Sequence, residues 1–163
     1  SIECLTLLAI ISKHLFIING YYVMIIAESI FSRIGNLRKV MSDPQIACLL
    51  SGIKGDESEH YKDLIIKVDD IVAKCPVTYQ TDGQGDNAIC QMHYFKGDSD
   101  VYIVELDVAG PPHTQAYGVI RLNGGYPELG YIDLDVLIKY GFELDLYYTQ
   151  QTVGEVMRRL TYE

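Results

Sequence analysis

The sequence has little positive charge for its length. It carries 13 Lys and Arg side chains against 22 Asp and Glu side chains, a formal net charge of −9. Proteins that bind nucleic acids by neutralising phosphates need the opposite balance, so direct nucleic-acid binding is disfavoured. The composition fits a soluble acidic protein instead, with or without a charged partner.

Cysteine and histidine are few and are not spaced as metal ligands. The four cysteines form no CxxC pair, the four histidines occur singly, and only Cys90 and His93 are near neighbours. A spacing of three residues on a strand turns these two side chains to opposite faces, which excludes a shared zinc ion or a Cys–His nucleophile pair. We therefore expect free thiols in a reducing compartment.

Motifs of the common hydrolases and nucleotide-binding proteins are missing as well. No serine lies in a GxSxG elbow, and the glycine-rich loop at 82–87 lacks the GK[ST] of a phosphate-binding loop. That loop also departs from a calcium-binding EF-hand, because its sixth position is Asn87 and its twelfth is His93. We interpret it as a glycine-rich turn, and the sequence identifies no catalytic residue.

Residues 1–40 differ in composition from the rest of the chain. The stretch 5–27 is the most hydrophobic part, and the charge balance changes from positive to strongly negative at Met41. Because Met41-Ser-Asp-Pro is typical of a protein start, our first interpretation is that residues 1–40 are a hydrophobic N-terminal extension outside the working domain. Two alternatives stay open: a helical element packed in the domain, and a membrane anchor through residues 5–27.

Residues 41–163 are predicted to form an acidic α+β domain, a single small domain with a mainly antiparallel sheet packed by a long helix and two shorter helices. An apolar stripe of helical period between Asp56 and Cys75 predicts the long helix, which a capping box at Asp56 and Glu59 would open. Alternating apolar residues then predict strands at 77–80, 88–95, 101–108, 116–122, 128–132 and 142–148. The short connections between them favour antiparallel pairing.

Capping residues predict the two shorter helices. Asp133 is a suitable N-cap for a helix of about two turns, and Gly141 lies where a left-handed C-cap is expected. Thr152 and Glu155 have the spacing of a capping box, which would open a terminal helix.

Several short segments resemble, in consistent order, a bacterial family known as the domain-of-unknown-function family 2958. They are CPVTY (75–79), HYF (93–95), VYIVELD (101–107), AYG (116–118), ELGYIDL (128–134) and ELDLYY (143–148). The resemblance covers about residues 72–157, and ELGY is its most specific part. It implies a bacterial protein, often encoded on mobile elements, without an established activity. One position departs from the family pattern, since Leu144 stands where an Arg is usual.

Acidic side chains on two of the predicted strands are the main candidate site. Alternation places Glu105 and Asp107 on one face of their strand, opposite Tyr102, Val104 and Leu106, and it places Glu143 and Asp145 on one face of theirs. If these strands are neighbours, the carboxylates converge, with Glu128 nearby, and would suit Mg²⁺ or Ca²⁺ or acid–base chemistry. The alternative is a solvated acidic surface, in which Tyr131 and Tyr147 are candidate recognition aromatics.

Two functions from different classes follow from these features. The first is a cytoplasmic, non-catalytic accessory or regulatory protein, without a cofactor, that binds a protein partner through an acidic, tyrosine-bearing sheet face. In a variant of this hypothesis, the acidic surface imitates the charge of nucleic acid. The alternative is a divalent-metal-dependent enzyme, such as a phosphodiesterase, that uses Glu105, Asp107 and Asp145.

Overall fold

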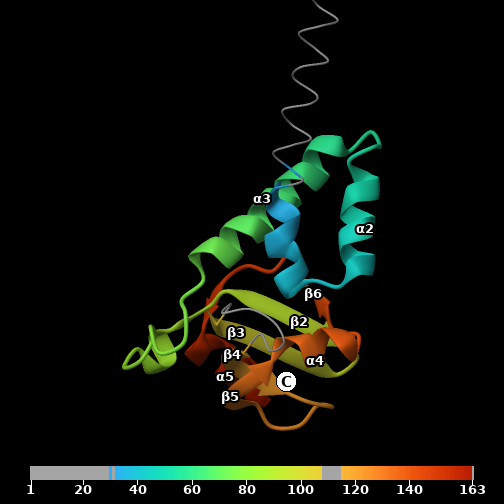
Figure 1. Cartoon of the computed structure of the whole chain (residues 1–163). Helices are drawn as coiled ribbons and strands as arrows, with labels where there is room; N and C mark the ends of the chain where they lie inside the picture. The colour runs from blue at the N-terminus through green and yellow to red at the C-terminus, as the bar shows by residue number, and fades with distance from the viewer. Residues whose placement is uncertain (1–29, 31, 108–114, 163) are drawn as a thin grey trace, which may run out of the picture.

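An antiparallel sheet of five strands, in the order β5-β4-β3-β2-β6, is the centre of the fold (Figure 1). The computed structural model of the protein describes residues 30, 32–107 and 115–162. The strands are Met92–Lys96 (β2), Ser99–Asp107 (β3), Gln115–Arg121 (β4), Glu128–Asp133 (β5) and Glu143–Leu144 (β6), and a second sheet pairs Ile89–Cys90 (β1) with Gln151–Thr152 (β7). All described pairs are antiparallel, which confirms the predicted α+β class.

Helices cover both faces of the main sheet. Residues 32–40 are helical, and the later helices are α2 (Asp43–Gly52), α3 (Ser58–Lys74), α4 (Leu134–Lys139) and α5 (Val153–Tyr162). The helices before the sheet pack on the face that carries Met92, Tyr94 and Ile103, whereas α5 packs with Tyr102 and Val104 on the opposite face (Figure 1). The sheet therefore separates a large core cluster from a smaller one, as in a layered α+β fold.

Local sequence signals explain most of the helices. The apolar stripe of α3 buries Leu64, Ile65, Val68 and Val72, as its helical period predicts. Asp133 caps α4 by accepting a hydrogen bond from the Val136 amide at 3.1 Å. The capping box of α5 forms as predicted, because Thr152 and Glu155 exchange backbone–side chain hydrogen bonds of 2.8 and 3.2 Å.

Three local predictions are wrong. The capping box at Asp56 does not form, because α3 has Glu57 as its N-cap without a side-chain bond. Residues 77–80 make a turn instead of a strand, with Gln80 N–H bonded to the Val77 carbonyl at 3.0 Å. Strand 142–148 is reduced to the two residues of β6, since the Asp145 carboxylate accepts the Tyr147 amide at 2.9 Å and turns the chain.

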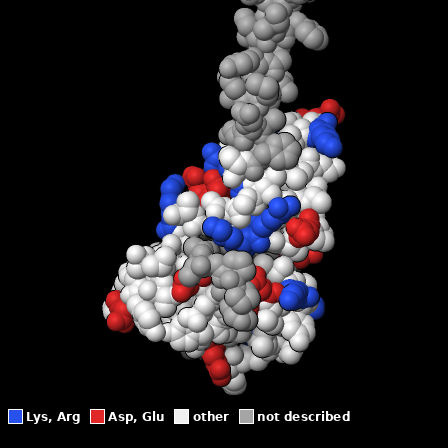
Figure 2. All heavy atoms as spheres, in the orientation of Figure 1, with Lys and Arg blue, Asp and Glu red and all other residues white. Residues whose placement is uncertain are grey.

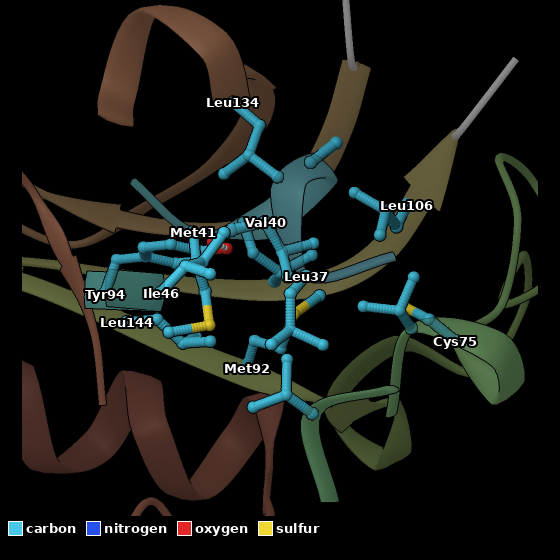
Figure 3. Packing of buried hydrophobic residues seen from close by; sticks show 14 of the residues in the cluster. Leu37, Val40, Met41, Ile46, Cys75, Met92, Tyr94, Leu106, Leu134 and Leu144 are labelled. Atoms are coloured by element: carbon cyan, nitrogen blue, oxygen red, sulfur yellow. Dashed lines mark hydrogen bonds between the residues drawn. The ribbon is translucent and has the colours of Figure 1, made fainter. Parts of the chain in front are cut away.

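Residues 32–40 belong to the same core as the rest of the domain. Leu37 and Val40 have no exposed surface and lie in the large cluster, where the Tyr94 hydroxyl donates a hydrogen bond of 2.6 Å to the Val40 carbonyl (Figure 3). Arg33 also forms an ion pair with Asp69 of α3. The boundary expected at Met41 thus falls inside this core, and the described part of the expected extension packs as a helical element. Residues 1–29 lie outside the described residues.

Gln45 of α2 holds the outer edge of the sheet. Its side-chain amide accepts from the Leu144 N–H at 3.2 Å and donates to the Leu144 carbonyl at 3.1 Å. Both backbone polar groups of this residue in β6 are therefore bonded on the side that faces away from β2, as a further strand would bond them. The contact joins α2 to the last strand of the sheet.

Across residues 30, 32–107 and 115–162, no helix combines the length and the apolar composition needed to cross a membrane. The hydrophobic stretch 5–27, for which a membrane anchor was one expectation, lies outside the described residues.

Candidate functional site: a tyrosine pocket beside Glu105

The five predicted acidic residues do not form one cluster. Glu105 and Asp107 lie on the central strand β3, while β6, which carries Glu143, is separated from it by β2. Glu128 lies on β5 at the other edge of the sheet. Accordingly, no group of three or more His, Cys, Asp and Glu side chains suited to a metal ion occurs among the described residues.

A β-bulge changes which side chains of β3 share a face. The register of β3 against β4 shifts between Ile103 and Glu105. Val104 and Glu105 consequently line the same pocket on the α5 side, whereas Ile103 and Leu106 belong to the opposite core cluster. The predicted alternation, which put Leu106 with Val104 and set Glu105 apart, is therefore wrong because the bulge inserts a residue into the pattern.

Glu105 is buried and is held by the turn that follows Pro76. Its Oε2 accepts the Tyr79 amide at 2.9 Å, and its Oε1 accepts the Thr81 amide at 2.7 Å and the Thr81 hydroxyl at 2.6 Å. Only 4% of the residue is exposed. Three donors around one carboxylate explain why the 78–83 segment becomes a turn directed at β3 instead of another strand.

These donors keep the carboxylate ionised. Burial by itself would raise the pKa of Glu105, but the hydrogen bonds from the Thr81 side chain, the Thr81 backbone and the Tyr79 backbone together lower it below its ordinary value of 4.5. No Lys, Arg or His among the described residues forms an ion pair with Glu105. The pocket therefore holds a buried negative charge whose donors, within the described part of the chain, are all neutral.

Three tyrosines surround this charge, and we call the cavity that they share with Glu105 the tyrosine pocket. Tyr79, Tyr117 and Tyr131 line a cavity of about 570 Å³, together with Thr81, Asp82, Gly83, Gly85, Ala88, Val104, Leu129 and Val153. The rings of Tyr117 and Tyr131 have centroids 5.4 Å apart and are inclined by 59°. Tyr79 and Tyr131 are 73% and 55% exposed, so the aromatic walls are reachable from solvent.

The mouth of the tyrosine pocket is shaped by an unusual backbone. Tyr79 has φ +69°, a left-handed conformation that costs free energy for a residue with a side chain. In this conformation its amide reaches Glu105. A hydrogen bond to Tyr79, followed by smaller contributions that include the Glu105 charge, raises the pKa of Tyr131. Tyr79 of the turn and Tyr131 of β5 line the same pocket as the buried carboxylate.

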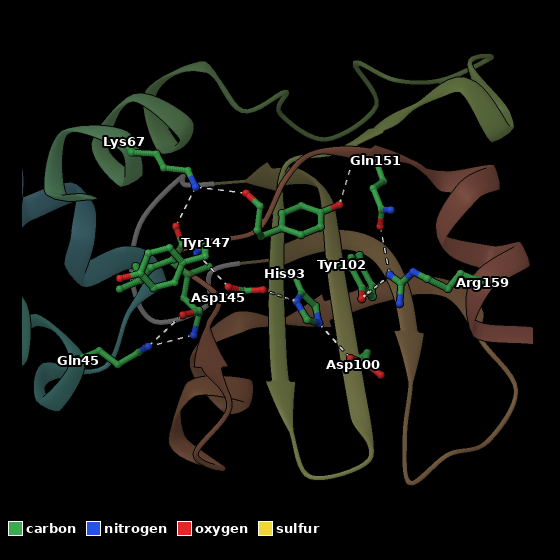
Figure 4. A network of polar contacts seen from close by, with 12 residues as sticks. Gln45, Lys67, His93, Asp100, Tyr102, Asp145, Tyr147, Gln151 and Arg159 are labelled. Carbon is green, nitrogen blue, oxygen red and sulfur yellow. Dashed lines mark hydrogen bonds and ion pairs between the residues drawn. The ribbon is translucent and has the colours of Figure 1, made fainter. Parts of the chain in front are cut away.

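Asp145 takes part in a different cluster, centred on His93 (Figure 4). The His93 ring nitrogens lie 3.2 Å from Asp145 Oδ2 and 3.0 Å from Asp100 Oδ1, and the ring stacks on Tyr102 with centroids 4.3 Å apart. Asp100 is also paired with Arg121 at 2.7 Å. This chain of polar contacts ties the segment after β6 to β2, β3 and β4.

Cys90 and His93 lie on the same side of the sheet, contrary to the prediction. Cys90 packs in the cluster that contains Tyr102, on whose ring His93 stacks. The alternation is interrupted because the chain leaves the strand at Gln91, whose amide bonds to the Ile103 carbonyl at 2.7 Å. Burial raises the pKa of the Cys90 thiol to about 12, so it is protonated and unsuited to be a nucleophile.

The remaining predicted residues lie elsewhere. Tyr147 stacks on His60 of α3, with ring centroids 6.0 Å apart. The Tyr147 hydroxyl and His60 Nε2 are joined by a hydrogen bond of 3.0 Å. Glu143 and Glu128 are exposed on opposite edges of the sheet. Of the residues predicted for the site, Glu105 and Tyr131 are the two that line this pocket.

On the face shown in Figure 2, the basic and acidic side chains of the described residues are interspersed. An imitation of nucleic-acid charge requires a continuous acidic surface, and this face does not present one.

Comparisons of the chain with protein-family models, with curated proteins and with solved structures give no match. The resemblance to family 2958 rests on the quoted segments alone. Sequence reasoning missed Tyr79, Thr81 and Tyr117 as members of the site. The only signal for Tyr79 and Thr81 was the run of glycine and aspartate that follows them, which marks a turn but does not say what the turn contacts.

Proposed function

We propose that the protein is a non-catalytic binding protein that recognises a partner protein through the tyrosine pocket. The observation that carries the proposal is the combination of exposed tyrosine rings with a buried, ionised carboxylate in one concave site. Tyrosine is enriched at protein interfaces because a large rigid ring buries much area at low entropic cost. Two such rings, 73% and 55% exposed, lie at the rim of this pocket.

The chemistry of the pocket favours binding over catalysis. A general acid or base works best when its pKa is near the working pH, whereas the donors around Glu105 lower its pKa below 4.5. The metal-dependent alternative needs Glu105, Asp107 and Asp145 together. It gains no support from the strand order, because β2 lies between β3, which carries the first two, and β6, which Asp145 follows. On the face seen in Figure 2, the mixture of acidic and basic side chains gives charge mimicry no support.

The resemblance of residues 72–157 to family 2958 supports a further part of the proposal. We place the protein among bacterial accessory or regulatory proteins, with a cytoplasmic location and without a required cofactor.

Photo-crosslinking tests the proposal. Benzoylphenylalanine replaces Tyr131 at the pocket rim, and in a matched control it replaces Tyr140, which is 69% exposed and lies just after α4. Irradiation in cells that make the protein naturally is expected to give a discrete protein adduct from position 131 that the control does not give. The adduct is also expected to weaken when Glu105→Gln is added. Equal labelling from both positions would argue against a partner at this pocket.

A further inference from the structure

We infer that the tyrosine pocket takes a primary ammonium group, the tip of a lysine side chain on the partner, in preference to a guanidinium group. The inference rests on the proposed function and specifies the chemistry of the same pocket. Four features of the described residues carry it.

The first feature is the uncompensated charge. Glu105 is 96% buried by area, since 4% is exposed, and it has no cationic partner among the described residues. The neutral donors offset the cost of taking the carboxylate out of water, since its pKa is lowered. They do not neutralise its negative charge, which has no opposite charge beside it among the described residues. A cationic ligand supplies the missing charge. Asp82, exposed at the rim of the same pocket, adds to the attraction.

The second feature is the number of acceptor positions that Glu105 has left. A carboxylate offers about four lone-pair positions. Two on Oε1 are taken by the amide and hydroxyl of Thr81, and one on Oε2 is taken by the amide of Tyr79. No donor of a described residue takes the remaining position, on Oε2. An ammonium group makes a single charge-assisted hydrogen bond of this kind, whereas the planar fork of arginine is matched to two carboxylate oxygens at once.

The third feature is the aromatic wall. The rings of Tyr117 and Tyr131 are inclined by 59° with centroids 5.4 Å apart, so they form a corner and not a flat stack. Cations are attracted to the faces of aromatic rings within about 6 Å of the centroid. A cation in this corner would gain from the rings and from Glu105 together.

The fourth feature is the apolar lining. Ala88, Val104, Leu129 and Val153 line the pocket beside the tyrosines. Lysine buries its methylene stem along apolar surface while its charged end finds a polar group. A cavity of about 570 Å³ has room for the whole side chain. This lining explains why a lysine side chain fits better than an inorganic cation.

The test measures the binding of four small probes to the full chain. The chain carries isotope-labelled tyrosine rings, and their NMR resonances report the binding. The probes are N-acetyl-lysine methylamide, its uncharged counterpart N-acetyl-norleucine methylamide, N-acetyl-arginine methylamide and n-butylammonium. We expect the lysine probe to shift the resonances of Tyr117 and Tyr131 saturably, and the norleucine probe to leave them unchanged. The arginine probe is expected to bind several-fold more weakly than the lysine probe.

Two variants separate the charge from the ring. Glu105→Gln is expected to weaken the lysine probe about tenfold, the loss typical of one charge-assisted hydrogen bond. Tyr131→Leu keeps an apolar wall but removes the aromatic ring, and we expect it to weaken binding of the lysine probe several-fold. This variant provides a second test if Glu105→Gln fails to fold. Tyr140→Phe, outside the tyrosine pocket, is expected to bind as the unaltered chain does.

The outcomes distinguish the inference from the proposed function. Equal binding of the lysine and norleucine probes, equal or tighter binding of the arginine probe, or no effect of Glu105→Gln and Tyr131→Leu would overturn the inference, even if a protein adduct forms at position 131. Selective binding of the lysine probe and n-butylammonium without a protein adduct would support the ammonium chemistry. It would overturn the proposal of a protein partner and point to a free alkylamine.

Discussion

At the scale of single residues, Glu105 joins two parts of the chain that are far apart in sequence. Its carboxylate receives three hydrogen bonds from a turn that lies more than twenty residues earlier. The backbone just before the turn is also bonded to β3, because the Pro76 carbonyl accepts the Leu106 amide at 2.8 Å. The Glu105 carboxylate then holds Tyr79 and Thr81, and with them one wall of the tyrosine pocket.

Thr81→Val tests this dependence. The change removes the hydroxyl donor while keeping the shape and the backbone amide. We expect it to lower the free energy of unfolding by about 1.5 to 3 kcal/mol, the range for a hydrogen bond to a charged group. We also expect it to raise the pKa of Glu105. Urea denaturation and a carboxyl NMR titration measure the two effects. The exposed Thr149→Val is the control, and an equal loss in both variants would contradict the prediction.

The lowered pKa of Glu105 also predicts how stability depends on pH. Since the folded-state pKa is below the ordinary value of 4.5, the ionised group contributes stability above pH 4.5 that is lost as the pH falls through the folded-state pKa. Glu105→Gln removes this contribution. We expect the gap in urea midpoint between the original chain and the variant to be wide at neutral pH and to narrow below pH 4.5. A gap that stays constant would show that the charge of Glu105 contributes nothing to folding.

Among the residues named from the sequence, Glu105 and Tyr131 line one pocket, but not in the arrangement that was predicted. Both were chosen as members of an acidic or aromatic sheet face. Their actual partners are backbone amides of a turn and the ring of Tyr117. Side chain–backbone bonds between distant segments leave no periodic pattern in the sequence, so neither Thr81 nor Tyr79 was recognisable.

At the scale of secondary-structure elements, the bulge in β3 brings the backbone of β4 unusually close. A Cβ at Gly118 would lie 1.8 Å from the Tyr102 carbonyl oxygen, a separation that no side chain can adopt. Gly118 pairs with Ile103, next to the shift in register. Only glycine fits there, and the bulge that turns Glu105 into the tyrosine pocket depends on it.

Gly118→Ala is therefore expected to be severe. We expect a loss of about 3 kcal/mol or more, because the clash is with backbone that cannot move without disturbing the sheet. The cross-strand partner Gly130 is a matched control, since an alanine Cβ there would meet only Ile120 Cδ1 at 3.7 Å. Gly130→Ala should change stability by less than about 1 kcal/mol. Thermal and urea unfolding of the two variants compare them directly.

Helix caps and the alternation of apolar residues correctly predicted those helices and strands that short stretches of sequence determine. Asp133 and Thr152 open α4 and α5 as expected, and alternation found β3, β4 and β5. The strands at 77–80 and 142–148 were wrong because Glu105 and Asp145 bond to backbone amides that a strand would have used. The strand order could not be read from sequence, since the chain returns from β5 through α4 to the far edge beside β2.

At the scale of the whole molecule, the first described helix is part of what holds the sheet to α3. Leu37 and Val40 are fully buried between the helices and the sheet (Figure 3). The change in composition near Met41 had indicated a boundary there. Composition reports charge and hydropathy along the chain, but it does not report which surfaces pack together.

Leu37→Ala is expected to cost about 2 to 5 kcal/mol, the range for a leucine truncated in a core. A chain that begins at Met41 should lose more, because it also lacks Val40 and the ion pair of Arg33 with Asp69. Ile66→Ala on α3, where the side chain is 38% exposed, is the control and should cost clearly less. If the chain beginning at Met41 unfolds at the same urea concentration as the longer chain, residues 32–40 do not stabilise the domain.

The side chain of Gln45 has a consequence beyond its two hydrogen bonds to Leu144. Exposed sheet edges are where proteins add foreign strands, the first step of fibril growth and of domain exchange between copies. By occupying both backbone groups of Leu144, Gln45 closes that edge, although β6 is only two residues long. The edge is protected by the packed helix α2 and not by the strand itself. A partly unfolded form in which α2 detaches would therefore expose the Leu144 backbone groups to pairing with another strand.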